Sequence, residues 1–247
     1  RAKWLFEELV KAGAPEEILY VHNPHIGTDN LIHVVKNIRK TIIDLGSKIV
    51  FNSKVTNIEP KNNSIELTIN GKVEIFDYVI LAIGHSSRDT IEMLYNNNCN
   101  IEQKPFAVGF RIEHKQESIN RAQFGVNYNN ESLGAAEYKL THQTKDKRGV
   151  YTFCMCPGGW VVPAASEEGM LVVNGMSEYH RDRVNANSAL LVSVDSKDFR
   201  SSHPLAGIQF QRELERKAFE LGGKNYSAPI QTVGDFINNK TTTKLGF

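Results

Sequence analysis

The sequence of 247 residues has little cysteine, no long apolar run and no excess of charge of either sign. Cys99, Cys154 and Cys156 are too few for a disulfide framework, which favours a reducing cytoplasm. No apolar run approaches the ~20 residues that span a bilayer, and no charged-then-apolar leader marks a signal peptide. Because 29 Lys and Arg residues balance 28 Asp and Glu residues, we expect no nucleic-acid or membrane partner.

The glycine motif that binds dinucleotides is missing as well. The chain begins at Arg1 and contains no G-x-G-x-x-G. Its two glycine pairs, Gly158-Gly159 and Gly222-Gly223, are isolated and lack the strand–glycine–helix context of that motif. We therefore expect the chain to be an internal piece of a longer protein.

The most informative stretch is Phe76–Thr90, FDYVILAIGHSSRDT. Asp77 precedes an uncharged run over 78–83, which predicts a strand buried on both faces of a parallel sheet. Ligands of open α/β sheets bind beyond the carboxyl ends of the strands, so Gly84 and His85 are candidates for ligand contacts. The alternatives are an ordinary buried strand that stops at a glycine, and a loop histidine.

The chain before this stretch alternates between helix and strand patterns. A helical pattern over 1–12 is followed by an amphipathic helix from Thr28 to Leu45, which Thr28 or Asp29 can cap and which Gly46 ends. The later elements that we expect are strands at Lys48–Ser53 and Val55–Ile58 and a hairpin of Ser64–Ile69 with Lys72–Phe76 about Asn70-Gly71.

The pattern changes at Pro105, after which aromatic and apolar residues alternate. The pattern after Pro105 predicts a strand at 104–114, a strand at 185–194 and a helix at Gln209–Leu221. Between the first two it predicts a meander of three strands, Tyr151–Cys156, Trp160–Ala164 and Met170–Asn174. We therefore predict an α/β (α+β) chain in which an α/β unit with a β-meander, residues 1–98, precedes a mainly-β unit, residues 103–235.

Several phrases of the sequence resemble known flavoproteins. FDYVILAIGH resembles a segment of flavoproteins that have two dinucleotide-binding domains. That segment consists of an acidic residue, an apolar run and Ala-Thr-Gly, and here Ile83 replaces the threonine. LAIGHSSRDT, KPFAVGFRIEH, YTFCMCPGG and NANSALL resemble a bacterial family of FAD-dependent oxidoreductases described as dehydrogenase-like flavoproteins. The resemblance spans at least three quarters of the chain.

This resemblance implies a partial FAD-binding domain at 1–98, an inserted substrate or cap domain at 103–235, and a linker at 236–247 that returns to the FAD domain. It implies an FAD-dependent oxidoreductase acting on a small-molecule substrate, with Gly84 and His85 near the FAD and NAD(P)H as a further candidate cofactor. Without the glycine motif, this chain alone should neither retain FAD nor be active, and its partner would be the rest of the parent flavoprotein. The alternative is a non-catalytic interaction or structural module derived from a flavoprotein.

An apolar substrate pocket needs a few polar groups, and aromatic side chains often line such cavities. The candidates in this sequence are Arg111, His114, Tyr151, Phe153, Asn174, Arg181, Asn185 and Asn187. For each asparagine the alternative is a turn or a strand-edge hydrogen bond. The sequence identifies no catalytic residue.

Two other patterns carry less weight. Cys154 and Cys156 would share one face of a strand, but a C-x-C in a strand lacks the turn or helix start that suits a redox dithiol, so we expect two small, buried, reduced residues. His22 and His25 have no further ligand nearby, so no metal site is predicted.

Overall fold

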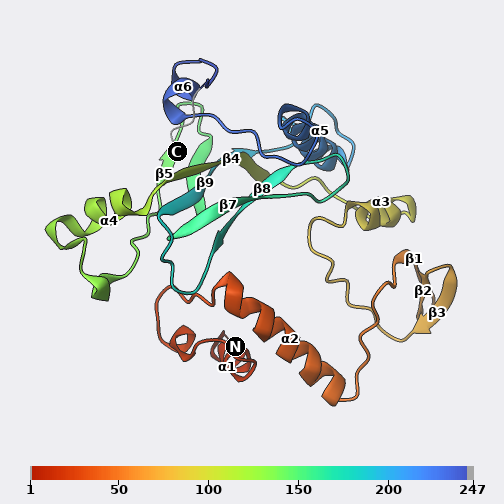
Figure 1. Cartoon of the computed structure of the whole chain (residues 1–247). Coiled ribbons are helices and arrows are strands. Elements are labelled where there is room, and N and C mark those ends of the chain that lie inside the picture. The colour runs from red at the N-terminus through yellow and green to blue at the C-terminus, as the bar shows by residue number, and fades with distance from the viewer. Residues whose placement is uncertain (1, 244–247) are drawn as a thin grey trace.

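The structure of the protein, a computed structural model, describes residues 2–243. Within these residues helices are combined with three antiparallel sheets (Figure 1). The predicted mixed class of helix and sheet is therefore confirmed. None of the described helices has the length and apolar character needed to cross a bilayer.

The chain begins with a small helical unit. Helices α1 (Ala2–Lys11), η1 (Glu16–Leu19) and α2 (Thr28–Asp44) pack around a core of Ala12, Ala14, Ile18 and Val34. The predicted helix at 28–45 is confirmed, and Gly46 follows it with φ 86°.

The predicted cap of α2 is wrong, because Gly27 is the N-cap and no side chain caps the helix. Thr28 instead donates to the Ser177 carbonyl at 3.2 Å, and the Asp29 carboxylate accepts from the Tyr179 N–H at 3.0 Å. Both bonds tie the start of α2 to the second half of the chain.

The first sheet is a meander of β1 (Val55–Pro60), β2 (Ile65–Ile69) and β3 (Lys72–Phe76), in the order β1-β2-β3. Asn70 (φ 49°) and Gly71 (φ 80°) form the turn between β2 and β3. Two successive positive φ values match the twist of a two-residue hairpin, so the hairpin predicted from Asn-Gly is confirmed.

Two predicted strands are not formed. Residues 48–53 and 77–83 have no strand structure, and their apolar side chains are exposed, with Tyr78 and Ile80 at 90% and 91%. A buried parallel strand needs neighbours that take its N–H and C=O groups. Among residues 2–243 neither segment has such a neighbour, so the prediction of a buried strand before Gly84 is wrong for this chain.

The second half of the chain builds a larger sheet from distant segments. Strands β4 (Phe106–Lys115), β9 (Asn185–Val194), β6 (Gly149–Cys156) and β5 (Thr141–Gln143) lie in this order, and β7 (Gly159–Ala164) pairs with β8 (Val172–Ser177) in a separate hairpin. The predicted meander of three strands is therefore wrong: β6 pairs with β9 and β5, and β9 pairs with β4 over all ten residues and with β6 at residues 187 and 189–192. After the turn at Pro157-Gly158, β7 pairs with β8 and not with a strand of the larger sheet.

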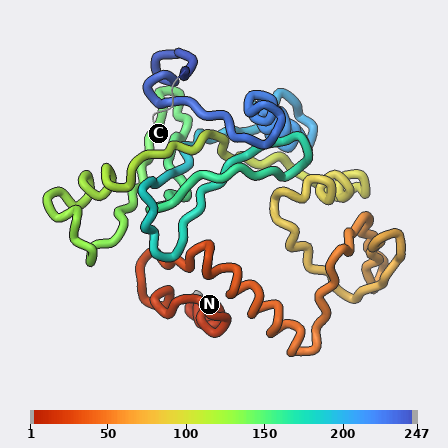
Figure 2. Tube along the Cα trace, viewed as in Figure 1, coloured from red at the N-terminus to blue at the C-terminus, as the bar shows by residue number. Residues whose placement is uncertain are grey.

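Helices and short turns complete this half of the chain. Helix α4 (Gln116–Phe124), η2 (Gly125–Asn127) and η3 (Glu131–Leu133) follow β4, and α5 (Ala206–Leu221) and α6 (Val233–Ile237) follow β9. A core of Val194, Phe199 and Ala206 packs with Phe106, Val108 and Phe210, and the Phe106 and Phe199 rings stack at 5.1 Å. The chain trace in Figure 2 places α1 and α2 on one side of the β7–β8 hairpin and α6 on the other side of the larger sheet.

The predicted linker at 236–247 starts inside α6, whose N-cap Thr232 accepts from the Asp235 N–H at 3.2 Å. Residues 238–243 have no regular helix or strand, and 244–247 lie outside the described residues.

A buried arginine fastens α3 (Arg88–Asn96) to the second half of the chain. Arg88 is 3% exposed, and its guanidinium donates to both carboxylate oxygens of Glu215 on α5, at 2.5 and 3.0 Å, and to Glu167 at 2.8 Å. Arg212 on α5 donates to the same Glu167 at 2.6–3.1 Å and also to Glu92 on α3. This network, Arg88–Glu215–Glu167–Arg212–Glu92, joins α3, the β7–β8 loop and α5.

Replacing Arg88 tests how much this network contributes. Arg88→Met should lower the free energy of unfolding by about 3–5 kcal/mol, because it leaves the Glu215 carboxylate buried without a counterion. Arg121→Met removes the exposed pair with Glu117 on α4 and should cost about 0.5 kcal/mol or less. Urea unfolding measures the free energy of unfolding of both variants. Equal decreases in this free energy would show that the network does not hold α3 in place.

The network also predicts a dependence of stability on pH. Hydrogen bonds from Arg212, followed by those from Arg88, lower the pKa of Glu167 from 4.5 to about 2. Since the folded pKa lies below the unfolded one, the ionised carboxylate stabilises the fold above pH 4.5, and this contribution is lost as the pH falls from 4.5 to about 2. Urea midpoints measured across this range should fall less steeply for Glu167→Gln than for the wild type, whereas Glu117→Gln should leave the slope unchanged.

Candidate functional site

An open cavity of about 450 Å³ lies between the segment 137–139 and the end of β6. Its walls are Asn23, Glu137, Tyr138, Lys139, Thr152, Phe153, Cys154 and Met155. Its volume falls within the range of about 300–1,000 Å³ that small-molecule sites occupy. The wall combines an aromatic ring, a phenol, a carboxylate and an ammonium group, so it offers both apolar contact and polar anchors.

A bulge in β6 shapes one wall of the cavity. The pairing of β6 with β9 shifts between Phe153 and Cys156, and Cys154 has φ 45°. The bulge breaks the alternation of side chains along the strand, so the expectation that the two cysteines form a buried pair on one face is wrong. Cys154 is exposed, Cys156 is half-buried, and both are free thiols.

Arg111 on β4 holds this bulge in place. Its Nη2 donates to the Cys154 carbonyl at 2.6 Å and lies 3.7 Å from the Cys156 sulfur, and its Nη1 donates to the same carbonyl at 3.3 Å. Its Nε donates to Oδ1 of Asn187 on β9 at 3.0 Å. The structure thus brings two of the residues singled out in the sequence into direct contact, beside the Cys154 carbonyl and the Cys156 thiol.

Gly175 on β8 makes room for this contact. A Cβ atom at position 175 would lie 2.4 Å from Asn187 Oδ1 and 2.5 Å from Arg111 Cζ, closer than any side chain tolerates. The hairpin can therefore approach the Arg111–Asn187 pair only with glycine here. Sequence reasoning missed this residue, although a glycine inside an apolar strand, VVNGMS, was the available signal.

Three buried nitrogen atoms next to the cavity have no hydrogen-bond partner: His114 Nδ1, Arg181 Nε and Asn187 Nδ2. His114 Nε2 lies 2.8 Å from the Tyr138 hydroxyl, and Arg181 Nη1 donates to Glu137 at 2.6 Å. Both of these partners line the cavity. Buried polar groups are rarely left unpaired in folded proteins, so a cluster of them marks a place where a ligand can be bound.

The ionisation of the neighbouring groups fits a donor-rich site. Burial raises the pKa of the Cys156 thiol, and the positive charges of Arg111 and Arg181 oppose this rise. Burial also raises the pKa of the Tyr138 hydroxyl. Both groups are therefore protonated at neutral pH, and Tyr138 can donate a hydrogen bond into the cavity.

The remaining candidates lie apart from this cluster. Asn185 donates to Glu113 at 2.5 Å at the end of the β4–β9 pair, and Asn174 is exposed on β8. Tyr151 is half-buried in β6 and is not among the residues of the cavity wall. The candidates that the structure brings to the cavity or directly behind it are Arg111, His114, Phe153, Arg181 and Asn187.

Gly84 and His85 are exposed in the loop before α3. Gly84 has φ 68°, and a Cβ atom there would meet nothing within 4 Å, so no cradle closes around it. The space beside Gly158 and Gly159 is already filled by the carbonyl oxygens of Arg181 and Met176, at 1.7 and 2.1 Å from the Cβ positions. The described residues therefore do not form the backbone cradle that the pyrophosphate of FAD requires.

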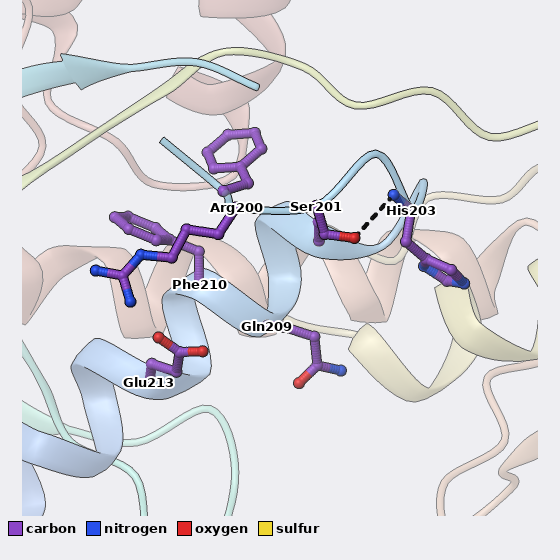
Figure 3. Close-up of a pocket in the computed structure, with 8 residues that line it drawn as sticks. Arg200, Ser201, His203, Gln209, Phe210 and Glu213 are labelled. Carbon is purple, nitrogen blue, oxygen red and sulfur yellow. Dashed lines mark hydrogen bonds between the residues drawn. The ribbon is translucent and has the colours of Figure 1, made fainter. Parts of the chain in front are cut away.

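A second, smaller pocket of about 270 Å³ lies against α5 (Figure 3). Its lining includes Arg200, Ser201, His203 and Glu213, and the His203 N–H donates to Ser201 Oγ at 3.1 Å. None of the residues singled out in the sequence lines it. Across residues 2–243, no three His, Cys, Asp or Glu side chains come together in a way that would hold a metal ion.

Comparison with known proteins identifies the class of protein. The model of the family "FAD-dependent protein, C-terminal domain-like" matches residues 105–247, which include all of the larger sheet and the cavity wall from Glu137 to Met155. The chain belongs to this family of FAD-dependent proteins. An uncharacterized protein of Clostridium beijerinckii is 56% identical over 248 residues, an alignment that covers 100% of this chain and 46% of that protein. The chain thus spans less than half the length of this relative.

Two solved structures share weak similarity with the chain. CtdE in complex with FAD is 16% identical with a TM-score of 0.29, covering 77% of this chain and 44% of that one. The tetracycline destructase Tet(51) is 14% identical with a TM-score of 0.30, covering 74% of this chain and 37% of that one. At such TM-scores neither similarity bears on the architecture or the activity of this protein.

A substitution at Gly175 tests the construction of the site. Gly175→Ala should push the Arg111 guanidinium off Asn187 and lower the free energy of unfolding by about 1–3 kcal/mol, because the interior has no space for the added methyl group. Gly234→Ala on α6 is the matched control, since its Cβ would meet nothing within 4 Å. Chemical denaturation of the two variants measures the difference, and a Gly175→Ala variant as stable as the control would contradict the described packing.

Proposed function

We propose that this chain is the substrate-side part of an FAD-dependent oxidoreductase and that a small-molecule substrate binds in the cavity at Glu137–Lys139 and Thr152–Met155. Membership of the family of FAD-dependent proteins supports the cofactor. The observation that carries the substrate site is the grouping of three unpartnered buried nitrogens directly behind the cavity wall.

Each group of this site has a role that its contacts support. Arg111 and Asn187 fix the shape of the bulge and present positive charge and amide N–H groups. The Tyr138 hydroxyl, held by His114, orients a polar atom of the substrate, and Phe153 supplies an apolar surface. When FAD is bound it supplies the transfer of electrons, and these residues supply position and electrostatics.

The partner that we propose for the exposed apolar segments is the rest of a longer flavoprotein. Val50, Phe51, Tyr78, Ile80 and Leu81 are 69%, 65%, 90%, 91% and 47% exposed, although their sequences are typical of buried strands. Neighbouring strands from a second segment would bury them and would place Gly84 and His85 at the end of a parallel sheet. The same exposed surface supports the second candidate function, a non-catalytic interaction module.

FAD binding separates these possibilities. The chain of 247 residues should be colourless when purified and should bind FAD more weakly than about 1 µM, roughly 8 kcal/mol, because Gly84 and His85 reach one edge of the ligand at most. The longer protein that contains it should be yellow and should bind FAD at least a hundredfold more tightly. The measurements are the flavin absorbance after dialysis and the quenching of FAD fluorescence on titration.

Two results would contradict the proposal. A yellow preparation of the short chain would show that its own residues form a complete FAD site. A colourless long protein that does not bind FAD would favour the interaction module over the oxidoreductase.

A further inference from the structure

The charges around the cavity do not balance. In the cavity wall itself Lys139 and Glu137 bring one charge of each sign, and Arg111 and Arg181 behind the wall add two positive charges. Glu137 is already engaged through both oxygens, one accepting from Arg181 at 2.6 Å and the other from Asn23 at 3.3 Å.

Arg111 is a half-buried cation that has no carboxylate partner. Among residues 2–243 no carboxylate lies within 4.0 Å of its guanidinium, which is held by the neutral oxygens of Cys154 and Asn187 and by the Cys156 sulfur. Glu113, two residues further along β4, accepts from Asn185 instead. A half-buried guanidinium without a counterion is costly for a protein to keep, and an anionic ligand removes that cost.

Free donors accompany this charge. The bonds of Arg111 use its Nε–H, both hydrogens of Nη2 and one hydrogen of Nη1, which leaves one N–H unused. Asn187 is completely buried, and because its Oδ1 accepts from Arg111, its Nδ2 is the atom without a partner. Arg181 Nε is likewise unpaired, although the side chain is 23% exposed as a whole. These donors suit the several lone pairs of a carboxylate.

We propose that the natural ligand of this cavity is an anionic small molecule of the carboxylate class, whose charge is met by Arg111, with Arg181 and Lys139 as supporting donors. The inference rests on the proposed function, since it names the substrate class of the same site. Lys139 lines the mouth of the cavity and is exposed, so it attracts the anion without being needed for folding. Tyr138, protonated at neutral pH, adds a neutral donor at the wall.

The test compares probes that differ only in charge. Benzoate and benzamide are titrated calorimetrically into the longer protein with its flavin bound, with inorganic phosphate as a third probe. Benzoate should bind at least tenfold more tightly than benzamide and more tightly than phosphate. Arg111→Met should abolish the preference for benzoate over benzamide, and Lys139→Gln should weaken benzoate binding severalfold. Arg121→Met, which removes an exposed arginine on α4, should change nothing.

The outcomes separate the two proposals. Equal binding of benzoate and benzamide, or a preference that survives both Arg111→Met and Lys139→Gln, overturns the anionic substrate but leaves an oxidoreductase with a neutral substrate. Tighter binding of phosphate than of benzoate overturns the carboxylate class. If Arg111→Met does not fold, the wild-type comparison and the exposed Lys139→Gln variant decide the question. A long protein without flavin is the separate result that removes the proposed function.

Discussion

The buried guanidinium of Arg88 is the contact on which the arrangement of the chain depends. It lies four residues after Gly84, and its ion pairs with Glu167 and Glu215 fasten the start of α3 to the β7–β8 loop and to α5. In the same loop, the Ser86 hydroxyl accepts a hydrogen bond of 3.2 Å from the Ser166 hydroxyl. A charge this deeply buried is tolerated only when it is paired with carboxylates. The ion pairs of Arg88 therefore fix the position of the loop that carries Gly84 and His85.

Arg88 and Arg111 differ in a way that separates structure from function. Arg88 has two carboxylates and an amide oxygen around it and serves to join elements. Arg111 has only neutral acceptors, although it lies beside a cavity and between strands that leave no room for a side chain at Gly175. Arg88, which is paired with carboxylates, stabilises the fold, whereas the charge of Arg111, which is held by neutral groups, is available to a ligand.

The sequence predicted the elements that depend on interactions between residues close together in the chain, and not those that depend on contacts between distant segments. Helix α2 and the hairpin at Asn70-Gly71 were predictable because a buried stripe and a turn signal act over a few residues. Residues 48–53 and 78–83 have the composition of buried strands, but a strand exists only with neighbours, and the described chain supplies none. Arg111 and Asn187 were found as polar residues in apolar strands. Their contact, the bulge at Cys154 and the role of Gly175 could not be foreseen, because each depends on contacts between segments at least 12 residues apart.

The most direct test of this account is an experimental structure of the longer flavoprotein with FAD bound. The account predicts that residues 78–83 form a strand with neighbours from outside this chain, that Gly84 and His85 contact the FAD, and that the isoalloxazine ring faces the cavity lined by Tyr138, Phe153 and Cys154. A structure in which 78–83 remains exposed, or in which the ring lies away from this cavity, would contradict it.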